Sequence, residues 1–87
     1  MRGDIVFVRT YGGLPLIRRV WDSDQRAVYI TNDEQLIKLS KGEKAIEPIG
    51  LPRDDVFRYD PDKAALMDKL QKEGGWDWSE LEHWKEN

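Results

Sequence analysis

Arginine and aromatic side chains recur together in the first third of the sequence, and their types suggest a binding function. The set comprises Arg9, Arg18, Arg19, Arg26, Tyr11, Trp21 and Tyr29. A guanidinium recognises phosphate through forked N–H groups and an aromatic ring stacks on a base, so this set could form a nucleic-acid-binding or anion-binding face. The interpretation that the pattern favours is cross-strand pairing of the arginines with Asp4, Asp22 and Asp24, with the aromatic rings in a core. The third interpretation is a protein-binding face.

Tryptophan is concentrated at the other end of the chain, in the segment WDWSELEHWKEN. The partner-binding candidates in this segment are Trp76, Trp78, Leu81 and Trp84. One Trp side chain can bury about 150–250 Å². We expect at least one of them to fold back onto the chain's own apolar surface. Those that stay exposed would bind a protein partner, since Trp is enriched at binding hot spots.

Residues that could catalyse a reaction or bind a metal are scarce. The sequence has one histidine, His83, and no cysteine, so a structural zinc site lacks ligands. The glycine pairs lack the Lys-Ser/Thr of a phosphate-binding loop. His83 is interpreted as a surface or tail-packing residue. We therefore predict no catalytic residue, no metal site and no cofactor.

The charge balance bears on the class of partner and on location. The net charge is −3; residues 1–53 hold nine basic and seven acidic residues, whereas residues 54–87 hold five and ten. Nucleic-acid-binding domains usually show a strong basic excess, so nucleic acid is less expected than protein. No apolar run approaches the ~20 residues of a membrane-spanning helix, and no signal peptide is recognisable. We expect a cytoplasmic protein without a membrane partner.

Three short apolar runs must position the arginines. Residues 5–8, 16–21 and 27–30 are rich in β-branched and aromatic residues and bounded by turn residues, which is typical of strands. Gly12-Gly13 and residues 22–25 predict turns, so the strands form an antiparallel meander. The run at 5–8 is apolar at every position. We expect one phase of it in the interior and the other beneath a helix.

The middle of the chain predicts a short helix and two further strands. Thr31 and Glu34 match a capping box, which places helical turns near 33–40. Pro48 and Pro52 each lack a ladder donor, which favours an edge position for the strand around them. The remaining elements are an edge strand at 46–49, a tight or 3₁₀ turn at 52–55 and a closing strand at 56–59.

The last third is predicted to be helical. Asp60 is a favourable N-cap and Pro61 suits the first helical position, so a helix begins there. Gly74-Gly75 ends this helix and is the predicted hinge. A second, short helix is expected to begin at Ser79 as its N-cap.

These elements predict a mainly β protein with a C-terminal α part. The expected fold is a small SH3-like or rolled antiparallel β-barrel of about five strands. Residues 1–59 form the barrel, residues 60–74 a capping helix, and residues 75–87 a short, Trp-rich, acidic helical tail, all within a single domain.

Two family resemblances point to the same architecture. RGDIVFVR followed by LIRRVW resembles the strand pair of the LexA-like repressor and signal-peptidase β-fold, over roughly residues 2–30. In that family a lysine on the return strand is the general base; Arg18 stands there, and a guanidinium stays protonated at neutral pH. The resemblance therefore implies a scaffold without catalysis. YITND, residues 29–33, is similar to MazF-like toxin barrels, although their Arg-Pro dipeptide is missing here.

The function predicted from the sequence is that of a non-enzymatic interaction module. It binds a protein partner through the arginine and aromatic strand face, through the Trp-rich tail, or through both. The alternatives are a nucleic-acid-binding SH3-like barrel, for RNA or DNA, and a MazF-like ribonuclease toxin.

Overall fold

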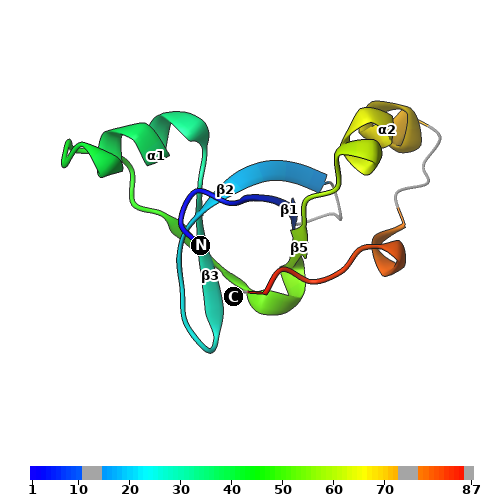
Figure 1. The fold of residues 1–87 in the computed structure, drawn as a ribbon, viewed down its shortest axis with the longest axis horizontal. Coiled ribbons are helices and arrows are strands. Elements are labelled where there is room, and N and C mark those ends of the chain that lie inside the picture. Colours follow the sequence, from blue (N-terminus) through cyan, green and yellow to red (C-terminus); the bar gives the residue numbers. More distant parts are fainter. Residues whose placement is uncertain (11–14, 73–76, 86–87) are drawn as a thin grey trace.

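The computed structural model describes residues 1–10, 15–72 and 77–85, and these form a mainly β protein. Figure 1 shows helices α1 and α2 at opposite ends of the long axis, with the strands between them. The elements in chain order are β1 (Ile5–Arg9), β2 (Pro15–Ser23), β3 (Ala27–Thr31), α1 (Asp33–Ser40), β4 (Ile49–Pro52), the 3₁₀ helix η1 (Arg53–Asp55), β5 (Val56–Arg58), α2 (Pro61–Lys72) and the 3₁₀ helix η2 (Trp78–Glu80).

The five strands form one antiparallel sheet in the order β4-β3-β2-β1-β5. The predicted meander of β1, β2 and β3 is confirmed. A shift of register between Val20 and Asp22 makes Trp21 an extra residue on β2, which is a β-bulge. Strands β4 and β5 are the two outer strands of the sheet, and η1 connects them.

Strand β1 is buried on both faces, as the unbroken apolar run predicts. Val6 and Val8 belong to a core on one face, called here the inner face, together with residues of β2, β3 and β5. Phe7 points the other way, onto the outer face, where it packs with Phe57 and Leu81. Ala64 and Met67 of α2 cover this second core. The predicted division of the run between the interior and a helix is therefore confirmed.

The C-terminal tail, described over residues 77–85, packs along β5. Its backbone pairs with the free edge of β5: the Arg58 N–H donates to the Glu82 carbonyl at 2.7 Å, and the Trp84 N–H donates to the Val56 carbonyl at 3.1 Å. Trp84 is 6% exposed and joins the inner-face core. Its indole N–H also donates to Asp4 Oδ2 at 3.3 Å. The expectation that at least one tail Trp packs on its own chain is confirmed.

Three predicted boundaries were wrong. The N-cap of α1 is Asn32, which exchanges hydrogen bonds with Gln35, whereas Thr31 is the buried last residue of β3. The edge strand begins at Ile49 rather than at 46. Within residues 77–85 the tail forms one 3₁₀ turn, and Asp77 caps it by accepting from the Ser79 N–H.

Other expectations agree with the structure or lie outside the described residues. Asp60 Oδ1 accepts from the Asp62 N–H at 2.9 Å at the start of α2, as an N-cap does. Gly12-Gly13 and Gly74-Gly75 are not among the described residues. Within the described ranges, no helix is long and apolar enough to cross a membrane.

We predict that Thr31→Val raises the free energy of unfolding by about 1 kcal/mol. The Thr31 hydroxyl is buried and has no hydrogen-bond partner among the described residues, and an isosteric methyl group removes its desolvation penalty. Val28→Thr on the same strand is the matched opposite change, because Val28 is fully buried and the variant would bury a hydroxyl there. It should lower the free energy of unfolding by about 1–3 kcal/mol. Urea denaturation measures both, and equal destabilisation by the two changes would contradict the prediction.

We also predict that Trp84→Ala lowers the free energy of unfolding by about 3–5 kcal/mol, as removal of a buried Trp side chain from a core does. Lys85→Ala, an exposed neighbour, should change it by less than about 0.5 kcal/mol. Thermal or urea unfolding followed by circular dichroism compares the two variants. A Trp84→Ala protein as stable as the Lys85→Ala protein would show that the tail does not contribute to the core.

Candidate functional site

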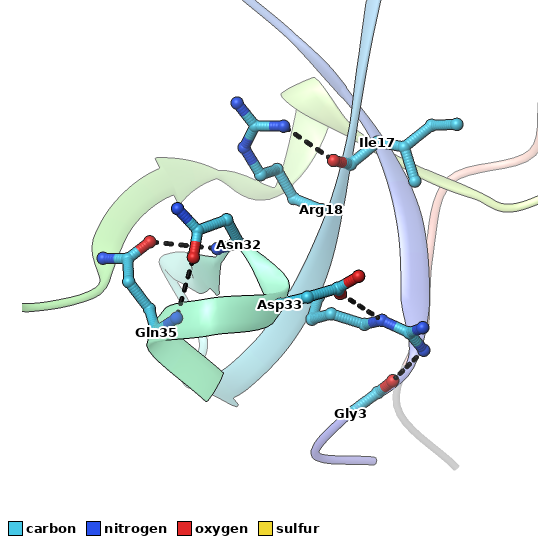
Figure 2. A network of polar contacts seen from close by, with 7 residues as sticks. Gly3, Ile17, Arg18, Asn32, Asp33 and Gln35 are labelled. Atoms are coloured by element: carbon cyan, nitrogen blue, oxygen red, sulfur yellow. Dashed lines mark hydrogen bonds and ion pairs between the residues drawn. The ribbon is translucent and has the colours of Figure 1, made fainter. Parts of the chain in front are cut away.

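The four arginines of the predicted binding face do not share one face: Arg9, Arg18 and Arg19 lie on strands, and Arg26 lies in the turn between β2 and β3. Arg18 and Arg19 are consecutive on β2, so their side chains leave opposite faces. Arg18 stands opposite Val6 on the inner face, and its NH1 donates to the Ile17 carbonyl at 2.8 Å. Figure 2 shows the Arg18 guanidinium turned back toward this carbonyl. Arg18 and Arg19 therefore cannot both contact a ligand that binds one face of the sheet.

Arg19 ties three segments of the chain together. Its Nε donates to Asp33 Oδ1 at 3.0 Å, and its NH1 donates to the Gly3 carbonyl at 3.1 Å. The dashed lines that end on Asp33 and Gly3 in Figure 2 mark these contacts. Asp33 lies in the first turn of α1, where the helix dipole also favours a carboxylate. Arg19 thus holds α1 and the N-terminal segment against β2.

Arg9 also lies on the outer face, but at the β1–β5 side of the sheet. Its Nε donates to Asp55 Oδ1 at 3.0 Å and its NH2 to the Asp54 carbonyl at 3.0 Å. Its guanidinium carbon lies 5.3 Å from the centre of the Phe57 ring and 5.6 Å from that of Trp78. These contacts connect β1 to η1 and to the tail. The arginines do pair with aspartates, but the partners are Asp55 of η1 and Asp33 of α1 rather than the predicted Asp4, Asp22 and Asp24.

Arg26 lies in the turn between β2 and β3, which is organised by Asp24. Asp24 Oδ1 accepts from the backbone N–H groups of Arg26 and Ala27, both at 2.8 Å. The Arg53 side chain donates to the Asp24 carbonyl at 2.7 Å. The turn is therefore fixed by backbone contacts of Arg26, and the Arg26 side chain is exposed.

The tail candidates serve the chain's own packing. Leu81 and Trp84 are 9% and 6% exposed, so their side chains are covered in this structure. Trp78 is half-buried, and its ring centre lies 4.8 Å from that of Phe57. Trp76 and, at the other candidate site, Tyr11 lie outside the described residues.

The single histidine also packs on the sheet. The His83 ring stacks on Phe57 with centres 4.8 Å apart, and its Nε2 lies 3.2 Å from the Asp54 carbonyl oxygen. Across the described ranges, no three His, Asp or Glu side chains gather as a metal-binding group. We find no arrangement here that points to acid–base or metal chemistry.

Two pairs of predicted residues each line a common hollow. Arg9 and Arg18 lie at one of about 530 Å³, whose other lining residues are mostly apolar. Trp21 and Tyr29 form the aromatic pair. They line a hollow of about 370 Å³ on the outer face of β2 and β3, with Asp22, Glu47 and Pro48. We call these five residues the aromatic–acidic hollow. The bulge on β2 aims Trp21 at this face, and Tyr29 reaches it because Val28 and Ile30 on either side point into the inner core.

Gly50 makes room for one wall of the hollow. It stands opposite Tyr29 on β4, and a Cβ atom placed on it would lie 2.9 Å from Tyr29 Cε1. The Tyr29 ring therefore lies across the backbone of β4. Its hydroxyl donates to Asp24 Oδ2 at 3.2 Å, which fixes the far end of the ring. Both ends of this side chain are thus positioned by the sheet and its turn.

Trp21, which forms the other wall of the hollow, makes a cation–π contact with Arg2. The Arg2 guanidinium carbon lies 3.9 Å from the centre of the Trp21 ring, and Arg2 Nε donates to the Trp21 carbonyl at 2.8 Å. Arg2 precedes β1 and Tyr29 belongs to β3, so they approach β2 from its two neighbouring sides. The indole is therefore packed against Arg2 and does not stand alone on the surface.

Acidic groups set the electrostatics of the turn beside the hollow. Two backbone N–H bonds, from Arg26 and Ala27, lower the pKa of Asp24. The hydrogen bond to Asp24 raises the pKa of Tyr29, and the charges of Asp24 and Asp22 raise it further. Both shifts have the direction expected of a neutral phenol that donates to a charged carboxylate.

Comparison of the chain with protein-family models, with curated proteins and with solved structures gave no match. The site therefore has to be interpreted from its own geometry.

The sequence indicated two members of the hollow and missed three. Trp21 and Tyr29 were named because of their residue type. Glu47 and Pro48 belong to the segment before β4, about twenty residues further on, and only the β3–β4 pairing brings them there. Gly50 between two apolar residues was the available signal, since a glycine inside a strand often marks the close approach of another group.

We predict that Asp24→Asn lowers the pKa of Tyr29 toward its ordinary value near 10. Asn keeps an oxygen for the turn N–H groups but removes the negative charge that disfavours the tyrosinate. Absorbance at 295 nm, in a Tyr11→Phe/Tyr59→Phe background, follows Tyr29 alone. Asp62→Asn, on α2, is the control. An unchanged titration midpoint in Asp24→Asn would show that Asp24 does not contact the phenol.

Proposed function

We propose that this chain is a non-enzymatic binding module that recognises a protein partner through the aromatic–acidic hollow. The observation that carries the proposal is the pair Trp21 and Tyr29, which line one surface hollow while each is half-exposed. Trp and Tyr are the side chains that most often dominate binding energy at protein interfaces. Both rings are also fixed before any ligand arrives, which reduces the entropy lost on binding.

The size of the hollow suits one long side chain of a partner segment. Its volume of about 370 Å³ lies at the lower end of the range for ligand pockets. Pro48 and the two rings offer apolar surface, while Asp22 and Glu47 are exposed around it. A flexible peptide segment that inserts a single side chain fits this arrangement better than a large rigid ligand.

The fold proposed for the module is the SH3-like barrel that the sequence suggested. Three features support it: the strand order β4-β3-β2-β1-β5, the meander of the first strands, and the 3₁₀ helix between β4 and β5. The bulge at Trp21 supports it further, because bulges bend a strand and increase its twist.

Nucleic acid is the less favoured ligand. Arg9 and Arg18 line one hollow, but Arg9 and Arg19 are paired with aspartates and Arg18 donates to the Ile17 carbonyl, so all three guanidinium groups are engaged within the chain. The carboxylates at the hollow would repel phosphate groups. The arrangement of charges therefore supports a protein partner.

The test is selection of a random peptide library on the wild-type protein, followed by affinity measurement on variants. We expect selected peptides to lose at least tenfold in affinity on Trp21→Ala and on Tyr29→Ala. Gly50→Ala should weaken binding in the same direction, because the added Cβ displaces the Tyr29 ring without deleting it.

Leu66→Ala removes an exposed apolar side chain on α2 and is the matched control. It should leave affinity unchanged, and circular dichroism should show all variants folded. Failure to select any peptide, or selected peptides that bind the folded Trp21→Ala and Tyr29→Ala proteins as tightly as wild type, would overturn the proposal.

A further inference from the structure

The carboxylates of the hollow lack a cationic partner in the structure. Asp22 Oδ1 accepts only from the Ser23 backbone N–H, at 2.8 Å, among the described residues. Glu47 makes no ion pair within the same ranges, although six other acidic side chains do. Both side chains are exposed and line the same hollow as the two rings. The site therefore presents negative charge that no ion pair among the described residues neutralises.

The indole at this site already accepts a guanidinium. Arg2 stacks over Trp21 at 3.9 Å, which is a close cation–π distance. Arg2 comes from the β1 side of β2, whereas the hollow opens toward Tyr29 and the segment before β4 and does not include Arg2. Arg2 therefore contacts Trp21 without lining the hollow, and none of the described residues that do line it is cationic: these are Trp21, Asp22, Tyr29, Glu47 and Pro48.

A third carboxylate lies beside the Tyr29 ring. Asp24 accepts from the Tyr29 hydroxyl at 3.2 Å, and this hydrogen bond, followed by the charges of Asp24 and Asp22, raises the pKa of Tyr29. Arg53, which donates to the Asp24 carbonyl, offsets part of the Asp24 charge. An aromatic face and a carboxylate each favour a positive charge placed between them. An uncharged side chain would cover the carboxylates without compensating their lost hydration.

We propose that the aromatic–acidic hollow selects a cationic side chain, lysine or arginine, presented by an extended segment of a partner protein. This inference rests on the proposed function and names the chemistry of its ligand. The alkyl part of the side chain would lie on the rings and Pro48, and its charged end would reach Asp22 and Glu47.

The experiment uses heptapeptide libraries that differ at the central position alone. Five immobilised libraries carry arginine, lysine, citrulline, norleucine or glutamate there, with random flanking residues. We expect the full-length protein to bind the arginine and lysine libraries at least tenfold more strongly than the other three. This preference should shrink as sodium chloride is raised, because salt screens exposed charges.

Two charge-neutralising variants assign the preference to this site. Asp22→Asn and Glu47→Gln, singly and together, should reduce the advantage of the cationic libraries at least fivefold in the double variant. Asp62→Asn removes a carboxylate from the exposed first turn of α2 and should leave it unchanged.

The outcomes separate this inference from the proposed function. Equal binding of all five libraries, lost on Trp21→Ala, would overturn cation selection while leaving a binding module. A cation preference that Asp22→Asn/Glu47→Gln does not alter would overturn the assignment to these carboxylates. No binding of any library at low salt would overturn both proposals.

Discussion

The fold depends on a strand that must be covered on both faces. β1 lies between β2 and β5, and its side chains alternate between two separate cores. Burying one Val or Phe side chain stabilises a fold by about 1.5–3 kcal/mol, so neither face of β1 can be left in water without a large loss. The two chain segments that cover it, α2 and the tail, are consequently integral parts of the structure.

The positions of α2 and the tail also determine where a binding surface can arise. On the outer face, α2 and the tail lie over Phe7 and Phe57, at the β1–β5 side of the sheet. Toward β4, the described residues that line the hollow at Trp21 and Tyr29 belong to β2, β3 and the segment before β4, and both rings remain partly exposed. The arginines on the same face serve mainly to attach peripheral segments: Arg9 holds η1 and Arg19 holds α1.

Much of this architecture could be predicted from local patterns. The apolar run at 5–8 indicated two-sided burial, and Asp60-Pro61 indicated the start of α2, because both signals depend on neighbouring residues alone. The cap of α1 was misassigned because Thr31 and Asn32 are both cap formers, and the difference between them is the burial of Thr31 at the end of β3. Local sequence does not encode that burial.

The site was harder to predict than the fold, for a physical reason. Arg18 and Arg19 looked like a pair in the sequence, yet strand alternation sends them to opposite faces. Glu47 and Trp21 look unrelated in the sequence, yet the register of β3 against β4 places them at one hollow. Residue type suggested candidates, but register decides which of them meet.

The attachment of the tail has a consequence for how the protein is made. Trp84 bonds to Asp4, a contact between residues 80 positions apart. At a synthesis rate of about 5–20 residues per second, roughly 4–16 s separate the two residues on the ribosome. During that interval Phe7 and Val8 have been synthesised, but the tail residues that bury them, Leu81 and Trp84, have not. The growing polypeptide is then most exposed to aggregation and to chaperones, and folding finishes only after Trp84 has emerged.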